Sequence, residues 1–82
     1  MTRREKLVER IRRRPPTAKF SDVKSLLEEF GWTHDRTKGS HAIFVKPGER
    51  TLPVPVHNGD VSRVYLDRIC DLLDLDNKNE TD

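Results

Sequence analysis

The sequence predicts a single small α+β domain in which helical segments come first, three strands follow and a helix ends the fold. Two changes of apolar period carry this prediction. Apolar residues recur at helical spacing up to residue 30 and again after residue 60, whereas residues 32–56 form short alternating runs broken by glycine and proline. The chain has 82 residues, of which 37% are charged and 33% apolar, so it has room for one small core and for no large enclosed pocket.

Three helices are expected. The first covers residues 3–13 and ends at two prolines, because proline cannot continue a helix from inside. The second lies between Ser21, which can cap its N-terminus, and Gly31, which stands where a C-terminal cap belongs. The last covers residues 62–75. The apolar face of the second helix contains Phe20, Val23, Leu26, Leu27 and Phe30.

The strands are expected at residues 32–36, 41–46 and 51–56. Pro47-Gly48 is the turn between the second and third strands, and Asn58-Gly59-Asp60 ends the sheet. The third strand contains two prolines, which lack an N–H donor, so it is expected at an edge of the sheet.

The predicted register of the second and third strands places apolar residues opposite each other. Ile43 faces Val54, and Val45 faces Leu52, on the side covered by the helices. His41 lies at the end of this side, opposite Val56. Phe44 then falls on the other side of the sheet.

Charge divides the chain into a basic head, a central domain and an acidic tail. The sequence predicts a basic N-terminal helix or arm at residues 1–19, a domain at 20–75 and a disordered tail at 76–82. Such an arm can follow phosphates, although a solvated helix face explains the charge nearly as well. Half of the 16 basic residues lie in the first 19 positions: Arg3, Arg4, Lys6, Arg10, Arg12, Arg13, Arg14 and Lys19.

The cysteine count and the hydropathy indicate the cellular location of the protein and exclude some kinds of site. The single Cys70 excludes an internal disulfide and a multi-cysteine zinc site. No apolar run approaches the length of a membrane-spanning helix, and the first residues lack the apolar stretch of a signal peptide. We therefore expect a cytoplasmic protein that contacts no membrane and uses no cofactor.

Gly39-Ser40-His41 is the stretch that can carry chemistry. Histidine can give or take a proton near neutral pH, and RNA supplies its own nucleophile in the ribose 2′-hydroxyl. Ser40 and the backbone N–H groups around Gly39 are candidate donors, and a second imidazole, His57, is expected at the same rim of the sheet. The candidate cations are Arg36, Lys38, Lys46 and Arg50.

Metal-dependent hydrolysis has less support in this stretch. It needs acidic ligands, and residues 35–57 contain only Asp35 and Glu49. A zinc site made from the three histidines lacks the close spacing of such sites. On these residues alone, Gly39-Ser40-His41 is also compatible with the ordinary entrance to a strand.

Residues 20–75 resemble the HicA family of type II toxin–antitoxin systems, also called YcfA-like mRNA interferases. The similarity rests on Phe30-Gly31-Trp32 at the end of a helix, on Lys38-Gly39-Ser40-His41 with Phe44 after it, and on Val54-Pro55-Val56-His57. The resemblance implies a double-stranded-RNA-binding-domain-like fold and ribosome-independent cleavage of mRNA, with His41 catalytic. The scarcity of carboxylates in this stretch adds the expectation that the cleavage is metal-independent. It also implies a cognate HicB-type antitoxin that covers the site.

A non-catalytic RNA-binding module of the same fold is the alternative. Such a module reads the minor groove and the 2′-hydroxyls of a duplex. A duplex binder typically presents a lysine-rich start of its last helix, whereas here Arg63 stands between Asp60 and Asp67. This difference favours the enzyme.

Overall fold

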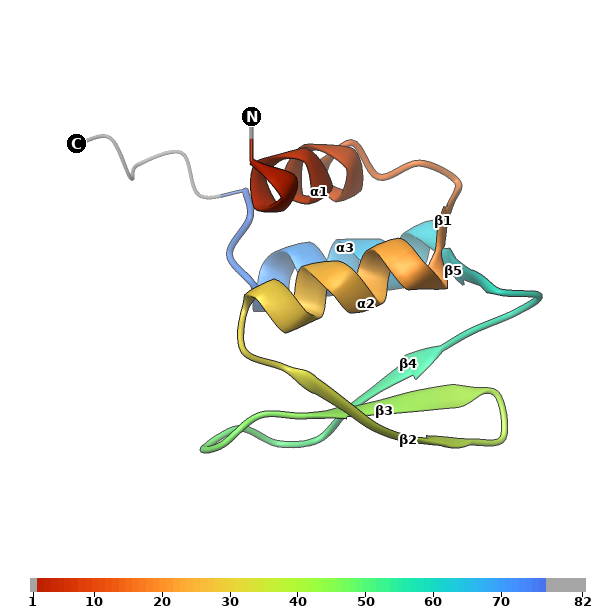
Figure 1. The fold of residues 1–82 in the computed structure, drawn as a ribbon. Helices are drawn as coiled ribbons and strands as arrows, with labels where there is room; N and C mark the ends of the chain where they lie inside the picture. Colours follow the sequence, from red (N-terminus) through yellow and green to blue (C-terminus); the bar gives the residue numbers. More distant parts are fainter. Residues whose placement is uncertain (1, 77–82) are drawn as a thin grey trace.

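A computed structural model describes residues 2–76, which form three layers (Figure 1). Helix α1 lies over α2 and α3, and these two helices cover one face of a three-stranded sheet. The α+β class is confirmed, and the predicted helices and three-stranded sheet follow one another in the expected order, with two further short strands, β1 and β5, between them. The elements are α1 (Arg3–Arg12), β1 (Thr17–Lys19), α2 (Phe20–Glu29), β2 (Thr33–Lys38), β3 (His41–Val45), β4 (Leu52–Pro55), β5 (Asp60–Ser62) and α3 (Arg63–Leu72).

Helix α2 shows how the local sequence sets helix ends. Gly31 has φ +93°, its N–H donates to the Glu28 carbonyl at 3.1 Å, and the Trp32 N–H donates to the Leu27 carbonyl at 3.0 Å. This is a Schellman C-cap, as the position of Gly31 predicted. The expected N-cap at Ser21 is wrong, because the helix begins earlier, at Phe20, whose N–H donates to the Gly59 carbonyl at 2.8 Å.

Helix α3 ends three residues before the predicted boundary at residue 75. Asp74 adopts φ +56°, and the Leu75 N–H donates back to the Cys70 carbonyl at 2.9 Å. The chain therefore turns, and Leu75 reaches the core although it lies outside the helix. Of the predicted tail, residues 77–82 lie outside the described residues.

Strands β1 and β5 form a separate antiparallel pair that the sequence did not predict. Asn58-Gly59 was expected to end the sheet, but both residues have positive φ, +53° and +81°, and they form a tight turn of the type I′ kind that leads into β5. Ala18 then pairs with Val61, and both are buried. The pair joins the N-terminal segment to the start of α3.

The predicted register between β3 and β4 is wrong by one residue. Phe44 lies opposite Leu52 and Ala42 opposite Val54, so Phe44 and Ala42 face the helices and are buried, whereas Ile43 lies opposite Pro53 on the open face. Phe44 is the bulkiest apolar side chain of β3, and turning it inward buries more apolar surface than turning Ile43 inward. The edge position of β4 is confirmed.

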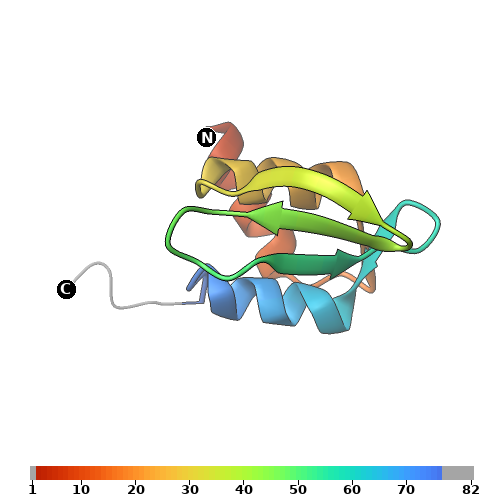
Figure 2. The ribbon, with the colours of Figure 1, turned by 90° about the horizontal axis from the view of Figure 1, so that it is seen from below.

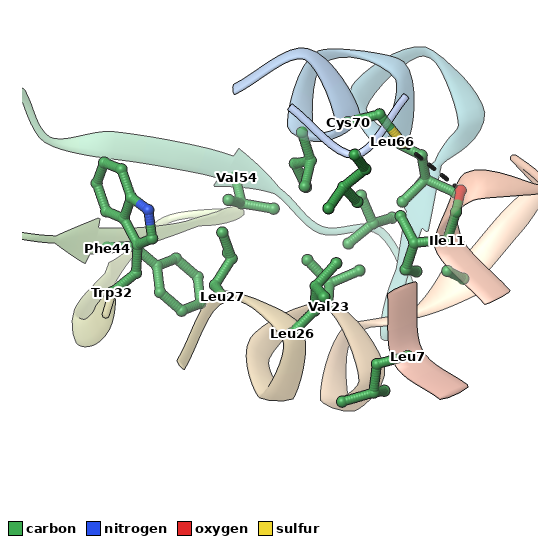
Figure 3. Packing of buried hydrophobic residues seen from close by; sticks show 14 of the residues in the cluster. Leu7, Ile11, Val23, Leu26, Leu27, Trp32, Phe44, Val54, Leu66 and Cys70 are labelled. Carbon is green, nitrogen blue, oxygen red and sulfur yellow. Dashed lines mark hydrogen bonds between the residues drawn. The ribbon is translucent and has the colours of Figure 1, made fainter. Parts of the chain in front are cut away.

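Helix α1 belongs to the same packed body as the rest of the fold. Leu7 and Ile11 are buried in the common core, and the Cys70 thiol lies 3.7 Å from the Ile11 carbonyl oxygen (Figure 3).

Several cations of the basic N-terminal segment form contacts with other residues of this chain. Arg10 forms an ion pair with Asp22 at 2.9 Å, and Arg14 forms one with Asp67 at 2.8 Å and another with Asp76. The Arg3 guanidinium donates a hydrogen bond to the Ser25 hydroxyl. The Arg4 guanidinium lies over the Phe30 ring, 4.3 Å from its centre.

Replacing Ile11 by alanine is expected to lower the free energy of unfolding by ~2–5 kcal/mol, because its side chain is fully buried between helices. Urea unfolding monitored by circular dichroism measures this change. Lys6→Ala on the exposed side of the same helix is the control, with an expected change within ~0.5 kcal/mol. Equal stability of the two variants would mean that α1 is an arm detached from the core.

The helices of the described part, residues 2–76, include none long and apolar enough to cross a membrane.

Candidate functional site

Gly39 and Ser40 form the two-residue tip of the β2–β3 hairpin. Lys38 and His41 are the last paired residues on either side of it. Gly39 has φ +61° and Ser40 does not have a positive φ, which is the pattern of a type II′ turn with glycine at its first central position. The glycine is therefore explained by turn geometry, and the same geometry presents Ser40 and His41 to solvent.

His41 lies on the open face of the three-stranded sheet, which Figure 2 shows without any helix in front of it. The sequence had placed it at the end of the helix-covered face, opposite Val56. Its partner on β4 is Pro55, and because Ala42 and Phe44 point inward, His41, Ile43 and Val45 point outward. His41 is exposed as a result.

Two of the predicted cations share this face with His41. Lys38 lies directly opposite His41, and Arg36 lies opposite Ile43. Both are exposed, and Arg36 forms an ion pair with Asp35. The register of β2 shifts between His34 and Arg36, so Asp35 is the extra residue of a bulge. Beyond the bulge, the alternation of β2 resumes with Arg36 and Lys38 turned outward.

His57 lies at the same end of the sheet. The Val56 N–H donates to the Ser40 carbonyl at 2.8 Å, which holds the end of β4 against the hairpin tip. His57 follows directly and opens the Asn58-Gly59 turn, where it exchanges backbone hydrogen bonds with Asp60 at 2.8 and 2.9 Å. Its side chain is exposed. The structure thus brings His57 to the rim that contains Gly39-Ser40-His41, as predicted.

Lys46 and Arg50 do not join this group. They lie beyond the other end of β3, about 16 Å along the strand from His41. The Lys46 ammonium stands 6.0 Å from the centre of the Trp32 ring, and Arg50 lines a shallow hollow with Trp32 and Leu72. They are near His41 in the sequence and were predicted to act with it. The extended conformation of β3 places them at the opposite end of the strand.

The third histidine has a different environment. His34 is half-buried, stacks on Phe44 with ring centres 5.1 Å apart, and meets Phe20 edge-on at 5.5 Å. Its Nε2 lies 3.1 Å from the Thr37 hydroxyl. It therefore packs on the helix side of the sheet, away from the face of His41. Within residues 2–76, no three histidine, cysteine or carboxylate side chains gather as a metal would require.

Two further ionisable side chains are structural. The Tyr65 hydroxyl donates to the Pro53 carbonyl at the outer edge of β4, and burial raises the pKa of this phenol. Burial also raises the pKa of the Cys70 thiol, in spite of the opposing charge of Arg14. A raised pKa leaves less thiolate at neutral pH, so Cys70 is a poor nucleophile.

One feature of this face differs from the sequence-based prediction. Ile43 was assigned to the core, and the structure places it beside His41 on the open side. Strict alternation allows only one of the neighbours Ile43 and Phe44 to face the helices. The greater bulk of Phe44 indicates that it, and not Ile43, takes the buried position.

Comparison with protein families matches residues 20–75 to the HicA toxin of bacterial toxin–antitoxin systems. No curated protein and no solved structure matches the chain. The match spans α2 to Leu75 and includes the whole β2–β3 hairpin, while α1 and β1 precede it. Because the match covers more than half of the chain, this protein belongs to the HicA toxin family, the toxin component of bacterial toxin–antitoxin systems.

Proposed function

We propose that this toxin is a metal-independent endoribonuclease, an mRNA interferase, in which His41 transfers a proton during cleavage. The observation that carries the proposal is an exposed imidazole at the start of β3, directly opposite the ammonium-bearing Lys38 and next to a glycine–serine tip. An open sheet face gives a long polymer access that an enclosed pocket would deny.

The reaction needs little beyond these groups. The ribose 2′-oxygen attacks the adjacent phosphorus, the bond from phosphorus to the 5′-oxygen breaks, and a 2′,3′-cyclic phosphate remains. The 2′-hydroxyl loses one proton and the departing 5′-oxygen gains one, and His41 serves one of these two transfers. Lys38, the Ser40 hydroxyl and the peptide N–H groups of the tip offset the charge that develops on the phosphoryl oxygens. His57 is a candidate for the second transfer.

The position of Arg63 argues against the alternative of a non-catalytic duplex binder. Arg63 is the cation at the start of α3, and its Nε donates to the Arg14 carbonyl at 2.8 Å. Its backbone N–H donates to the Pro16 carbonyl at 3.1 Å. This arginine contacts the N-terminal segment through its Nε, and α3 begins with this one arginine where a duplex binder typically has a lysine-rich start.

The family implies an antitoxin partner, and we assign it to the HicB type. A protein that covers the hairpin tip and the open sheet face would block His41 from RNA. The cell could then hold the folded toxin inactive without altering its fold.

RNA cleavage is expected to persist in excess EDTA and to leave 2′,3′-cyclic phosphate ends. Asp35 is paired with Arg36, and within residues 2–76 no three histidine, cysteine or carboxylate side chains gather, so the site is poor in ligands for a divalent cation. Product ends are identified by mass spectrometry after incubation of purified toxin with a defined RNA.

An all-deoxy strand of the same sequence is the matched control. It retains the phosphates but lacks the nucleophile, so it should bind and stay intact. Activity that disappears on chelation and returns with added Mg²⁺ or Zn²⁺ would contradict the proposed mechanism.

A further inference from the structure

The open face of the sheet carries apolar side chains that the core does not use. Ile43 and Val45 of β3 point away from the helices and are half-buried, and Pro53 and Pro55 lie opposite Ile43 and His41 on β4. Together these four side chains form an aliphatic strip, defined here as Ile43, Val45, Pro53 and Pro55. Figure 2 shows that no helix covers this face of the sheet.

Ile43 is the member of the aliphatic strip nearest to the proposed reaction. It is two residues from His41 on the same strand face, so their Cα atoms are about 6.6 Å apart. Its cross-strand neighbours are Arg36 on one side and Pro53 on the other. An apolar surface therefore adjoins His41, with exposed cations along the β2 side.

This combination matches an unpaired nucleotide. Its phosphate is an anion suited to Arg36 and Lys38, and its base offers a flat face for apolar contact. In a duplex the bases are stacked on one another inside the helix, and the protein meets phosphates and 2′-hydroxyls instead. The aliphatic strip would therefore make no apolar contact with the bases of a duplex.

We infer that Ile43 is a positioning and specificity residue on which the base next to the cleaved bond packs, so that the site takes unpaired RNA and rejects duplex RNA. This inference rests on the proposed cleavage at His41 for its place in the reaction. Base packing on Ile43 fixes the strand across β3 and holds one phosphate at the hairpin tip. Ile43 itself takes no part in proton transfer.

The test compares Ile43→Thr with Val64→Thr. Threonine keeps the β-branched shape that suits a strand and removes apolar contact surface. Val64 is the matched control, because it is 83% exposed on α3 and lies outside the sheet. For both variants, kcat and KM are measured on an unpaired RNA and on the same RNA annealed to its complement. The Kd of each variant for the all-deoxy strand is measured separately.

Ile43→Thr is expected to raise KM and the Kd of the all-deoxy strand by roughly fivefold, with kcat within about twofold of wild type. Val64→Thr should change neither constant. Annealing the complement should reduce kcat/KM of the wild-type protein by more than about tenfold.

Two results would overturn the inference: an unchanged KM and Kd in Ile43→Thr, or a duplex cleaved as fast as the single strand. The binding arm separates this inference from the proposed function. If the wild-type protein cleaves no RNA but Ile43→Thr still weakens binding of the all-deoxy strand, the proposed cleavage fails and the base contact stands.

Discussion

Replacing His41 by alanine is expected to lower the rate of RNA cleavage by about 10²–10⁴-fold, the usual contribution of general acid–base catalysis, and to abolish growth inhibition. The fold should remain, because His41 is exposed on the open face and its truncation leaves no internal cavity. Antitoxin binding should survive as well, since one exposed side chain is a small part of the surface that a protein interface buries. Single-turnover cleavage, a thermal melt and co-purification with the antitoxin measure the three properties.

His57→Ala is the matched control for this experiment, because it removes a second exposed imidazole from the same rim. A loss comparable to that of His41→Ala would make the two histidines an acid–base pair. We expect a milder loss, in which case His57 positions the RNA or the turn. A folded His41→Ala protein that cleaves RNA at the wild-type rate would leave the hairpin tip with a structural role alone.

Replacing Phe44 by alanine is expected to lower the free energy of unfolding by ~3–5 kcal/mol. Phe44 is fully buried on the helix-covered side of the sheet, near Trp32 and Leu27 (Figure 3). It also packs on His34 and Phe20, so its removal leaves a cavity and breaks this aromatic cluster. Urea unfolding followed by Trp32 fluorescence provides the measurement.

Ile43→Ala is the comparison that makes this result informative. Ile43 is half-exposed on the open face, so its truncation should cost less than about 1.5 kcal/mol. The register expected from the sequence predicts the reverse order of the two losses. A larger destabilisation for Ile43→Ala than for Phe44→Ala would therefore restore that register.

The parts of the fold that the sequence predicted are those set by local chemistry. Gly31 ends α2 because a left-handed residue closes a Schellman cap. Gly39 has a positive φ and lies in the break expected between residues 36 and 41. The prolines of β4 place it at the sheet edge. Each of these rests on the conformational preference of one residue and needs no distant partner.

The parts that the sequence did not predict depend on contacts between distant segments. Thr17–Lys19 becomes a strand only because Asp60–Ser62 pairs with it. The register of β3 on β4 depends on which of Ile43 and Phe44 fills the space beneath α2 and α3, and a local pattern describes both equally well. The reversal of this one strand moved His41 from the helix-covered face to the open face.

The candidate site divides in the same way. Lys38, Gly39, Ser40 and His41 are contiguous, so the sequence alone holds them together at the tip. His57 was correctly placed at the same rim, because two neighbouring antiparallel strands bring their opposite ends together. Lys46 and Arg50 were grouped with His41 because they are cationic and near it in the sequence. An extended strand, β3, separates them from His41 in space.

The anchoring of α1 has a consequence for the order in which a nascent chain can fold. Ile11 meets Cys70, and Arg14 bonds to Asp67 and Asp76, so the first helix to be synthesised completes its contacts with nearly the last described residues. Synthesis proceeds from the N-terminus, whereas the β2–β3 hairpin contains only short-range pairs and can form once its own residues have emerged. During translation, the hairpin that bears His41 can therefore form before α1 completes its contacts with α3.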